Sequence, residues 1–210
     1  MTRLRCARAL VVGVGGVGGW CAEALVRTGL KHLTIVDDDT VAESNLNRQC
    51  AALVSTLGKP KTEAMKVRLT AIDPSCEVTA LAVRYPSSSI PSLGGFDFVI
   101  DAIDSVEAKA DLILSASDAG VRLVSSMGAA LRTDPTKVGV RRFDKIEGDA
   151  LARALRNRFK KLSRFPSARF NCIVSDEPPK PIPQRGSIMS VTCAFGMALA
   201  AEVLRQLESI

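Results

Sequence analysis

The sequence contains no C-x-x-C pair, although it has six cysteines in 210 residues. They are Cys6, Cys21, Cys50, Cys76, Cys172 and Cys193. Zinc knuckles and disulfide frameworks need cysteines at short, regular spacings, which these lack. We therefore expect no zinc, and we expect reduced thiols that mostly pack as small apolar side chains.

Long apolar runs are also missing. The most apolar stretch, residues 187–201, ends at Glu202 and is shorter than the roughly 20 residues that a membrane-spanning helix needs. We expect a buried helix there. The N-terminus lacks the cleavage site of a signal peptide, because its apolar run breaks into glycines at Gly13. A cytoplasmic protein is the expectation.

Positive charge is in excess, and the excess is local. The chain has a net charge of +6, yet the segment 132–185 holds 14 of the 28 Lys and Arg residues and only 6 of the 22 Asp and Glu residues. That segment therefore carries +8 and the rest of the chain −2. A basic region beside a neutral domain suits a polyanion such as nucleic acid, and a merely solvated basic face fits the same composition.

Apolar periodicity predicts an α/β protein. Strands are expected at 9–13, 33–36, 77–83, 96–100 and 122–125, with helices at 20–29, 60–72 and 106–119. The helix over 60–72 is expected to turn Ala64, Val67, Leu69 and Ile72 inward. Because strands alternate with helices, the predicted fold is a Rossmann-like, doubly wound and mostly parallel sheet.

The pattern changes after residue 135. A strand is expected at 137–143, a basic helix at 149–162, a strand at 170–175, an extended proline-rich loop at 177–187 and a closing helix at 188–207. We therefore divide the chain into a Rossmann-like domain, 1–135, and a basic C-terminal extension, 136–210, that packs on the same domain.

A glycine-rich motif marks a candidate phosphate site. Gly13, Gly15, Gly16 and Gly18 form a G-x-G-x-x-G pattern, with a further glycine, between a predicted strand and a predicted helix. Such glycines let the backbone approach phosphate, and the helix N-terminus offers free N–H groups. Asp37, at the end of the next strand, is placed to accept hydrogen bonds from ribose hydroxyls. The alternative is a tight turn that binds nothing.

Two basic residues follow this motif. Arg48 offers a planar fork of donors and Lys61 a compact charge, so together they can neutralise the charge that develops as pyrophosphate leaves. A nicotinamide cofactor needs no such pair, which argues against a dehydrogenase. The structural alternative is that both residues only form salt bridges with nearby acids.

The ordered set of motifs resembles the ubiquitin-activating-enzyme-like adenylating superfamily. The set comprises GVGGVG, the D-x-D strand end, N-x-N-R-Q, G-x-P-K and D-A-I-D, and it extends over roughly residues 9 to 130. The resemblance implies ATP as substrate, bound by the four glycines and by Asp37, Asp39, Asn45, Arg48, Gln49 and Lys61. It also implies that Asp104, the second acid of D-A-I-D, lies beside magnesium and the α-phosphate, whereas Asp101 is expected to be structural.

Further residues favour one branch of the superfamily. Sulfur-carrier activators usually have two C-x-x-C pairs that hold zinc, and this chain has none. The run 99–106, Lys109 and the sequence 134–136 are similar to tRNA threonylcarbamoyladenosine dehydratases. This resemblance implies ATP-dependent dehydration and cyclisation of N6-threonylcarbamoyladenosine in tRNA through an adenylated carboxylate, with Arg48, Lys61 and Asp104 as catalytic residues.

The resemblance also implies partners. A homodimer is expected, and sulfur-transfer or redox proteins are possible further partners. The basic segment suits tRNA independently, since Lys and Arg contacts to phosphate supply much of the affinity for RNA. On the basic helix, Arg156 and Lys160 are expected to contact the tRNA.

Three other functions stay open at this point. They are adenylation of the C-terminal glycine of a ubiquitin-like sulfur carrier, a non-catalytic nucleotide-binding module, and a nicotinamide dehydrogenase. Cys172 is expected to be a buried strand residue rather than a nucleophile, because Arg169 is its only basic sequence neighbour. The single histidine, His32, is expected at the surface, opposite the glycine loop.

One feature departs from the superfamily. Its members usually have a segment before the first strand whose arginine reaches the triphosphate, whereas Gly13 is already the first glycine here. Arg3, Arg5 and Arg8 lie too close to the first strand for that role. If the segment is missing, we expect nucleotide binding to survive and adenylation to be weaker.

Overall fold

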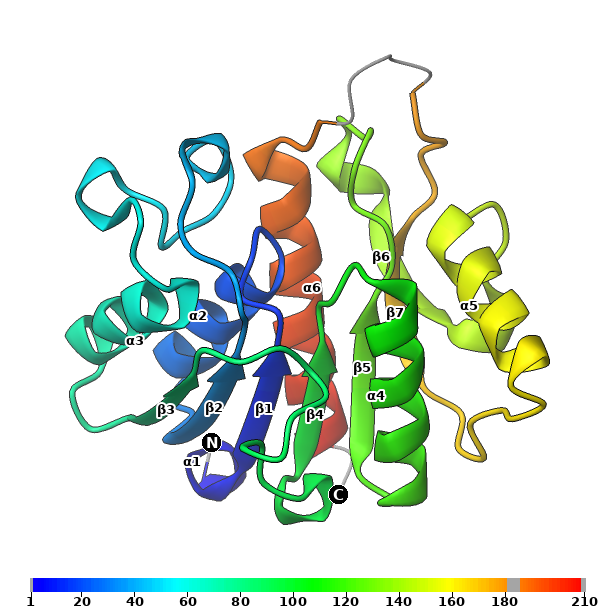
Figure 1. Ribbon diagram of the computed structural model, residues 1–210, viewed down its shortest axis with the longest axis horizontal. Coiled ribbons are helices and arrows are strands. Elements are labelled where there is room, and N and C mark those ends of the chain that lie inside the picture. Colours follow the sequence, from blue (N-terminus) through cyan, green and yellow to red (C-terminus); the bar gives the residue numbers. More distant parts are fainter. Residues whose placement is uncertain (1, 181–185, 209–210) are drawn as a thin grey trace.

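The computed structural model describes residues 2–180 and 186–208, and this part of the chain forms a seven-stranded sheet with helices on both faces (Figure 1). The strands are β1 (Arg8–Val12), β2 (His32–Val36), β3 (Glu77–Leu81), β4 (Phe98–Asp101), β5 (Arg122–Ser126), β6 (Val138–Arg142) and β7 (Asn171–Ser175). Their order is β3-β2-β1-β4-β5-β7-β6, and only β6 runs antiparallel to its neighbour. The predicted doubly wound, mostly parallel sheet is confirmed.

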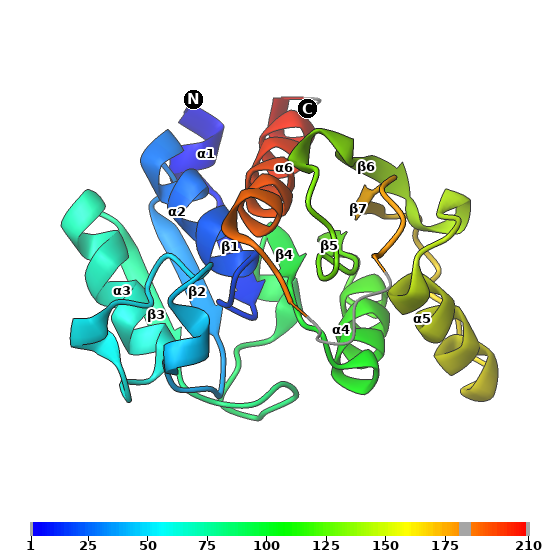
Figure 2. The ribbon, with the colours of Figure 1, turned by 90° about the horizontal axis from the view of Figure 1, so that it is seen from above.

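The helices divide between the two faces of the sheet, as Figure 2 shows from above. They are α1 (Thr2–Cys6), α2 (Gly18–Thr28), α3 (Lys61–Ile72), α4 (Val106–Asp118), α5 (Ala150–Lys161) and α6 (Met189–Glu208). One apolar core joins α2, α3 and α6 to the sheet, and a second joins α4 and α5 to the opposite face. In β1, Ala9 and Val11 enter the first core while Leu10 and Val12 enter the second, as the alternation of a strand requires.

The predicted elements agree with the observed ones to within a few residues, with two differences. The short helix α1 was not predicted, and Val67 does not point inward but is 69% exposed. Met65 is fully buried in its place. Val67 lies about 200° around the helix from Met65, because successive residues are about 100° apart. The helix therefore buries the face that contains Met65 and Leu69 against α2 and β3.

The C-terminal elements belong to the same sheet as the Rossmann-like part. β7 pairs with β5 in parallel, and β6 forms the outer strand beside β7. The closing helix α6 packs along α2, where a Cβ on Gly196 would lie 2.6 Å from the carbonyl oxygen of Val17. Of the predicted proline-rich loop, residues 181–185 lie outside the described residues.

Two remaining expectations concern exposure. His32 stands at the start of β2, with its side chain 42% exposed and paired with Glu77 at 3.0 Å. It is a surface residue, as predicted. Within residues 2–180 and 186–208, no helix combines the length and apolar character required to cross a membrane.

Candidate nucleotide-binding site

A cavity of about 610 Å³ opens at the carboxyl edge of the parallel strands. This volume lies in the range of roughly 300–1,000 Å³ that is common for small-molecule sites. The chain reverses its winding between β1 and β4, which is where doubly wound sheets bind ligands. Of the residues predicted for the site, those that line the cavity are Gly13, Gly15, Gly16, Asp37, Asp39, Asn45, Arg48, Gln49, Lys61 and Asp104. Gly18 does not line it.

The glycine loop is packed so tightly that side chains are excluded. Gly13 has a φ of +90°, and a Cβ there would lie 2.7 Å from the carbonyl oxygen of Ala102. A Cβ on Gly18 would lie 1.8 Å from the carbonyl oxygen of Gly13. Gly18 therefore closes the turn behind the cavity, while Gly13 lets the loop after β1 press against the loop after β4.

This packing predicts a large difference between two glycine variants. Gly29 also has a positive φ, +114°, but a Cβ there would meet nothing within 4 Å. We expect Gly29→Ala to lose about 1 kcal/mol of unfolding free energy, the cost of the left-handed backbone. Gly13→Ala should lose clearly more and should also weaken ATP binding, since its Cβ pushes on the Ala102 carbonyl. Urea unfolding and ATP titration check this, and equal losses in the two variants would contradict it.

Asp37 is fixed by the glycine loop. Its carboxylate accepts hydrogen bonds from the backbone N–H of Val14 at 2.8 Å and of Asp39 at 3.0 Å. Burial raises the pKa of this carboxyl group, while those two bonds and the nearby Lys61 ammonium oppose the rise. The side chain therefore stands at the end of β2 with a defined orientation, as an acceptor for hydroxyl groups requires.

Lys61 begins α3 and reaches back over the end of β2. Its ammonium pairs with the Asp39 carboxylate at 2.6 Å, and its side chain is only 9% exposed. Asp39 is 66% exposed. The alternative that Lys61 only forms a salt bridge with a nearby acid is thus partly correct, because Lys61 does pair with Asp39. That acid also lines the cavity, so the ammonium stays at the site where phosphates are predicted.

Arg48 forms no salt bridge with an acid in the described residues. Its guanidinium donates to the carbonyl oxygen of Ser44 and to Oδ1 of Asn47, both at 2.8 Å. Its own carbonyl oxygen accepts a hydrogen bond from the Trp20 indole at 3.0 Å, which ties this segment to α2. A Cβ on Gly16 would lie 3.3 Å from Cγ of Arg48. The arginine therefore lies directly over the glycine loop.

Asn45 and Gln49 are both buried, but they differ in what holds them. Oδ1 of Asn45 accepts a hydrogen bond from the backbone N–H of Ala42 at 3.1 Å and so shapes the turn that precedes Arg48. Gln49 faces the glycine loop, since a Cβ on Gly15 would lie 3.6 Å from its Nε2. Gln49 is thus able to contact a bound group directly, and Asn45 mainly supports the turn.

Asp104 and Asp101 lie at opposite sides of the loop after β4. Asp104 is exposed and lines the cavity, and its side chain makes no hydrogen bond or ion pair with any described residue. Asp101 is fully buried and pairs with Lys109 at 2.8 Å. The sequence-based distinction between an Asp104 at the site and a structural Asp101 agrees with these positions.

Several other residues that line the cavity were not predicted from the sequence. They include Arg84, Tyr85, Ser126, Met127, Gly128, Ala129, Ala130, Leu151 and Thr192. Most of them follow the carboxyl ends of β3 and β5, and position relative to a predicted strand was the signal that could have found them. Leu151 and Thr192 lie in the first turns of α5 and α6, far along the chain, so only the folded structure brings them here.

Cys172 is a buried residue of β7, as predicted. It has no exposed surface, and burial raises the pKa of its thiol well above the ordinary value. Such a thiol is protonated at neutral pH and is a poor nucleophile. The structure therefore does not support acyl transfer to Cys172.

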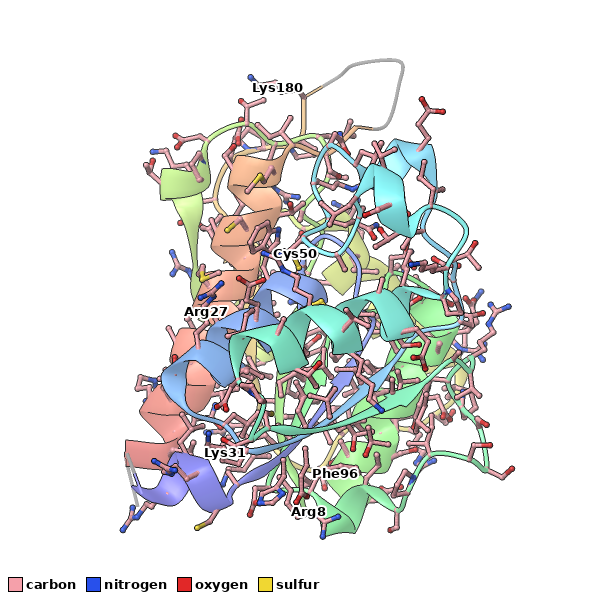
Figure 3. The ribbon with its side chains drawn as sticks, turned by 90° about the vertical axis from the view of Figure 1, so that its left-hand side faces the viewer. Arg8, Arg27, Lys31, Cys50, Phe96 and Lys180 are labelled. Atoms are coloured by element: carbon pink, nitrogen blue, oxygen red, sulfur yellow. The ribbon has the colours of Figure 1, made fainter. Side chains whose placement is uncertain are left out.

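The N-terminal arginines lie away from the cavity. Arg3 and Arg5 are in α1 and Arg8 begins β1, at the amino edge of the sheet. In Figure 3, Arg8 lies at the lower end of the molecule and Lys180 at the upper end. Arg3 donates instead to the carbonyl oxygen of Leu207 in α6. These three arginines are consequently too far around the fold to enter the cavity of their own chain, in line with the sequence expectation.

The fold and the site together define a protein of the doubly wound class, in which a glycine loop and the cations Arg48 and Lys61 face one cavity at the carboxyl edge of the sheet. The model of the ThiF family matches residues 1–210, and the chain belongs to this family. The resemblance inferred from the ordered motifs is thus confirmed.

Several proteins of one name are similar to this chain over most of its length. The chain is 42% identical over 153 residues to the tRNA threonylcarbamoyladenosine dehydratase of Bacillus subtilis, covering 72% of this chain and 60% of that protein. It is 34% identical over 213 residues to the enzyme of that name from Haemophilus influenzae, covering 97% of this chain and 82% of the relative. The structure of the E. coli tRNA N6-threonylcarbamoyladenosine dehydratase in complex with ATP superimposes with a TM-score of 0.89 at 34% identity, covering 99% of this chain and 88% of that one.

Proposed function

We propose that this chain uses ATP to dehydrate and cyclise N6-threonylcarbamoyladenosine in tRNA. One observation carries the proposal: a single cavity gathers the glycine loop, the Asp37 carboxylate, the cations Arg48 and Lys61, and the free carboxylate of Asp104. The relatives of this name support the choice of substrate, and the E. coli enzyme of the same name has been solved with ATP and with AMP.

The chemistry starts from an unreactive carboxylate. An oxygen of the threonyl carboxylate attacks the α-phosphorus of ATP, the bond from that phosphorus to the bridging oxygen of pyrophosphate breaks, and a mixed anhydride forms. An oxygen or nitrogen of the neighbouring carbamoyl group then attacks the acyl carbon and AMP leaves. The second step is intramolecular and depends mainly on positioning. The sum is loss of one water from the nucleoside and conversion of ATP to AMP and pyrophosphate.

The residues of the cavity suit the first step. Arg48 and Lys61, which line the cavity together with Arg84, would bind the β- and γ-phosphates and stabilise the charge on departing pyrophosphate. Asp37 would accept hydrogen bonds from the ribose, and Gly13, Gly15 and Gly16 leave the backbone open to the phosphates. Asp39 would release Lys61 as the phosphates take its place.

The donor set also fits magnesium. Asp104 presents an unpaired carboxylate at the cavity, and carboxylate oxygens are the ligands that this hard cation prefers. Asp37, Asp38 and Asp39 bring further carboxylates within 4.8 Å of one another. Asp104 is the residue we assign to holding the ion, which when bound would offset negative charge on the phosphates.

The proposed tRNA surface is narrower than the whole basic segment. Several of its arginines are engaged inside the fold or with acids: Arg132 with Asp149, Arg141 with Asp176, Arg142 with Asp144 and Arg164 with Asp118. Arg156, predicted to contact tRNA, is half-buried and donates to the carbonyl oxygens of Phe143 and Ile146. Its guanidinium also lies over the Phe143 ring. Arg156 therefore has a role within the fold, and we leave it out of the proposed surface.

The outer face of α5 supplies part of the available charge, beside other exposed cations such as Lys145 and Arg169. Arg153, Lys160 and Lys161 are exposed, and their side chains form no ion pair in the described residues. Positions 153 and 160 are seven residues apart and so lie on one face of the helix. The helix begins beside the cavity, since Leu151 lines it, and α5 forms the outer right-hand edge of the molecule in Figure 1. We infer that RNA phosphates follow this face to the cavity.

Charge reversal on this face tests the tRNA surface. We expect Arg153→Glu together with Lys160→Glu to lower tRNA affinity at least about tenfold and to reduce the dependence of binding on salt, because phosphate contacts are lost. The matched control, Lys59→Glu with Lys66→Glu, makes the same change of charge at exposed residues near α3, at the other side of the molecule (Figure 1). Filter binding at several salt concentrations checks this. Equal losses in the two double variants would place the RNA elsewhere.

The decisive experiment is nucleoside mass spectrometry. The protein is incubated with threonylcarbamoylated tRNA and magnesium ATP, and AMP is measured in the same tube. We expect a nucleoside lighter by one water, with one AMP for each nucleoside changed. Unchanged tRNA would overturn the proposed reaction. If ATP still bound, a sulfur carrier would then be tested as substrate, and absence of AMP with both would indicate a non-catalytic module.

A further inference from the structure

Lys109 is a fully buried lysine that does not line the cavity. It lies in the first turns of α4, and its side chain has 0% exposure. The N-terminal end of a helix carries positive partial charge, so a buried ammonium there is unfavourable unless it is paired. The groups that bind this ammonium therefore determine what Lys109 does in the fold.

The ammonium of Lys109 is held by two groups at the end of β4. It pairs with Oδ2 of Asp101 at 2.8 Å and donates to the carbonyl oxygen of Ile103 at 2.8 Å. Asp101 is also fully buried, and the same Oδ2 accepts a hydrogen bond from Oγ of Ser125 on β5 at 2.6 Å. The pair is consequently fixed to two adjacent strands and one helix.

The Lys109–Asp101 pair binds both backbone polar groups of Ile103, its N–H and its carbonyl oxygen. Oδ1 of Asp101 accepts a hydrogen bond from the N–H of Ile103 at 3.1 Å, while Lys109 donates to the carbonyl oxygen of the same residue. That carbonyl belongs to the peptide that joins Ile103 to Asp104. On the other side of the loop, the N–H of Ala102 donates to the carbonyl oxygen of Val12 at 2.9 Å. The backbone leading to Asp104 is thus fixed at three points.

We propose that Lys109 and Asp101 are positioning residues that hold Asp104 at the nucleotide. Asp104 has no side-chain partner of its own among the described residues, so the orientation of its carboxylate depends on the backbone that carries it. Neither Lys109 nor Asp101 lines the cavity, so both act through that backbone. The inference rests on the proposed function, in which Asp104 serves the adenylation step.

The test uses a double variant, Asp101→Asn with Lys109→Met, in the full-length protein. It removes both buried charges, so neither is left unpaired, and it removes the donor to the Ile103 carbonyl. We expect kcat for AMP release to fall about 10–100-fold, since displacement of a supporting contact commonly costs this much. KM for ATP should change by less than about threefold, because Arg48 and Lys61 are untouched. Hydrogen exchange of the peptide that contains Ile103 and Asp104 should become faster.

A matched variant separates positioning from general destabilisation. Glu23→Gln with Arg68→Met removes another ion pair, 2.6 Å long, that joins α2 to α3 away from Asp104. We expect it to lower stability without lowering kcat. Asp101→Asn alone is the second variant: it keeps the Lys109 donor to the Ile103 carbonyl but leaves that buried ammonium without its carboxylate, so it should lose more stability than the double variant while kcat falls less. If kcat in both Asp101 variants equals that of the matched variant, the proposal is overturned.

Failure of the proposed function and failure of the positioning inference give different results. A wild-type protein that releases no AMP with tRNA would remove the adenylation role, while exchange at residues 102–105 would still report whether the pair fixes this backbone. Unchanged exchange in the double variant would overturn the positioning inference whatever the substrate. Faster exchange confined to this loop, with exchange in the core strands unchanged, would support it.

Discussion

Replacing Asp104 by alanine is expected to reduce ATP-dependent turnover by about two orders of magnitude or more while the protein stays folded. We expect this loss because the carboxylate lines the cavity. There it is proposed to hold the ion that offsets negative charge on the phosphates during adenylation. The fold should tolerate the change, because Asp104 is exposed and its side chain has no partner in the described residues. Unfolding free energy should therefore stay within about 0.5 kcal/mol of the wild-type value.

The measurement for this variant is AMP release with tRNA, together with urea unfolding. Glu107→Ala is the matched control, since it removes the same charge three residues later, at an exposed position on α4 that does not line the cavity. The control should turn over at a rate near that of the wild type. A fully active Asp104→Ala protein would show that this carboxylate has no part in the chemistry.

Regular patterns predicted the fold well. The apolar residues of β1 and β4 are contiguous because both faces of a parallel sheet are buried, and this signal is local. The orientation of α3 was less predictable. Val67 is as apolar as its buried neighbours, but α3 lies near the edge of the sheet and buries only one side. Which side it buries is decided by contacts with α2 and β3, which sequence spacing does not contain.

The candidate site was predictable where chemistry is tied to strand ends. Asp37 and the glycine loop follow parallel strands directly and Asp104 follows β4 three residues later, so their meeting at one edge follows from the fold class alone. The Lys109–Asp101 pair was not predictable in this way. A lysine in a helix is usually solvated, and only the packing of α4 against β4 and β5 buries it.

For the basic segment, residues 132–185, the sequence gives the total charge but not its exposure. Its net charge of +8 follows from the sequence, but the structure decides which charges are available to a partner. Arg132 and Asp149 form a pair that is about 5% exposed, so this arginine stabilises the turn before α5 and contributes little to the outer potential. Arg153 and Lys160 remain exposed. A tRNA surface therefore has to be defined by exposed and unpaired cations, and composition alone overestimates its size.

Replacing Lys61 by alanine is expected to weaken ATP binding at least about tenfold more than AMP binding. AMP lacks the β- and γ-phosphates that the ammonium is proposed to bind, so the loss should scale with those groups. The variant also leaves the Asp39 carboxylate without its 2.6 Å partner, which adds repulsion toward the triphosphate. Titration calorimetry with both nucleotides gives the two affinities directly.

Two further variants identify the source of that loss. Lys59→Ala removes the same charge at an exposed residue that does not line the cavity, and it should leave the preference for ATP over AMP unchanged. Asp39→Asn breaks the ion pair but retains the ammonium, so the preference for ATP should persist there as well. A lysine that only holds Asp39 in place would behave differently: Lys61→Ala and Asp39→Asn would then shift both nucleotides equally. Loss of ATP preference in Lys61→Ala alone would assign the ammonium to the outer phosphates, because only that variant removes the cation.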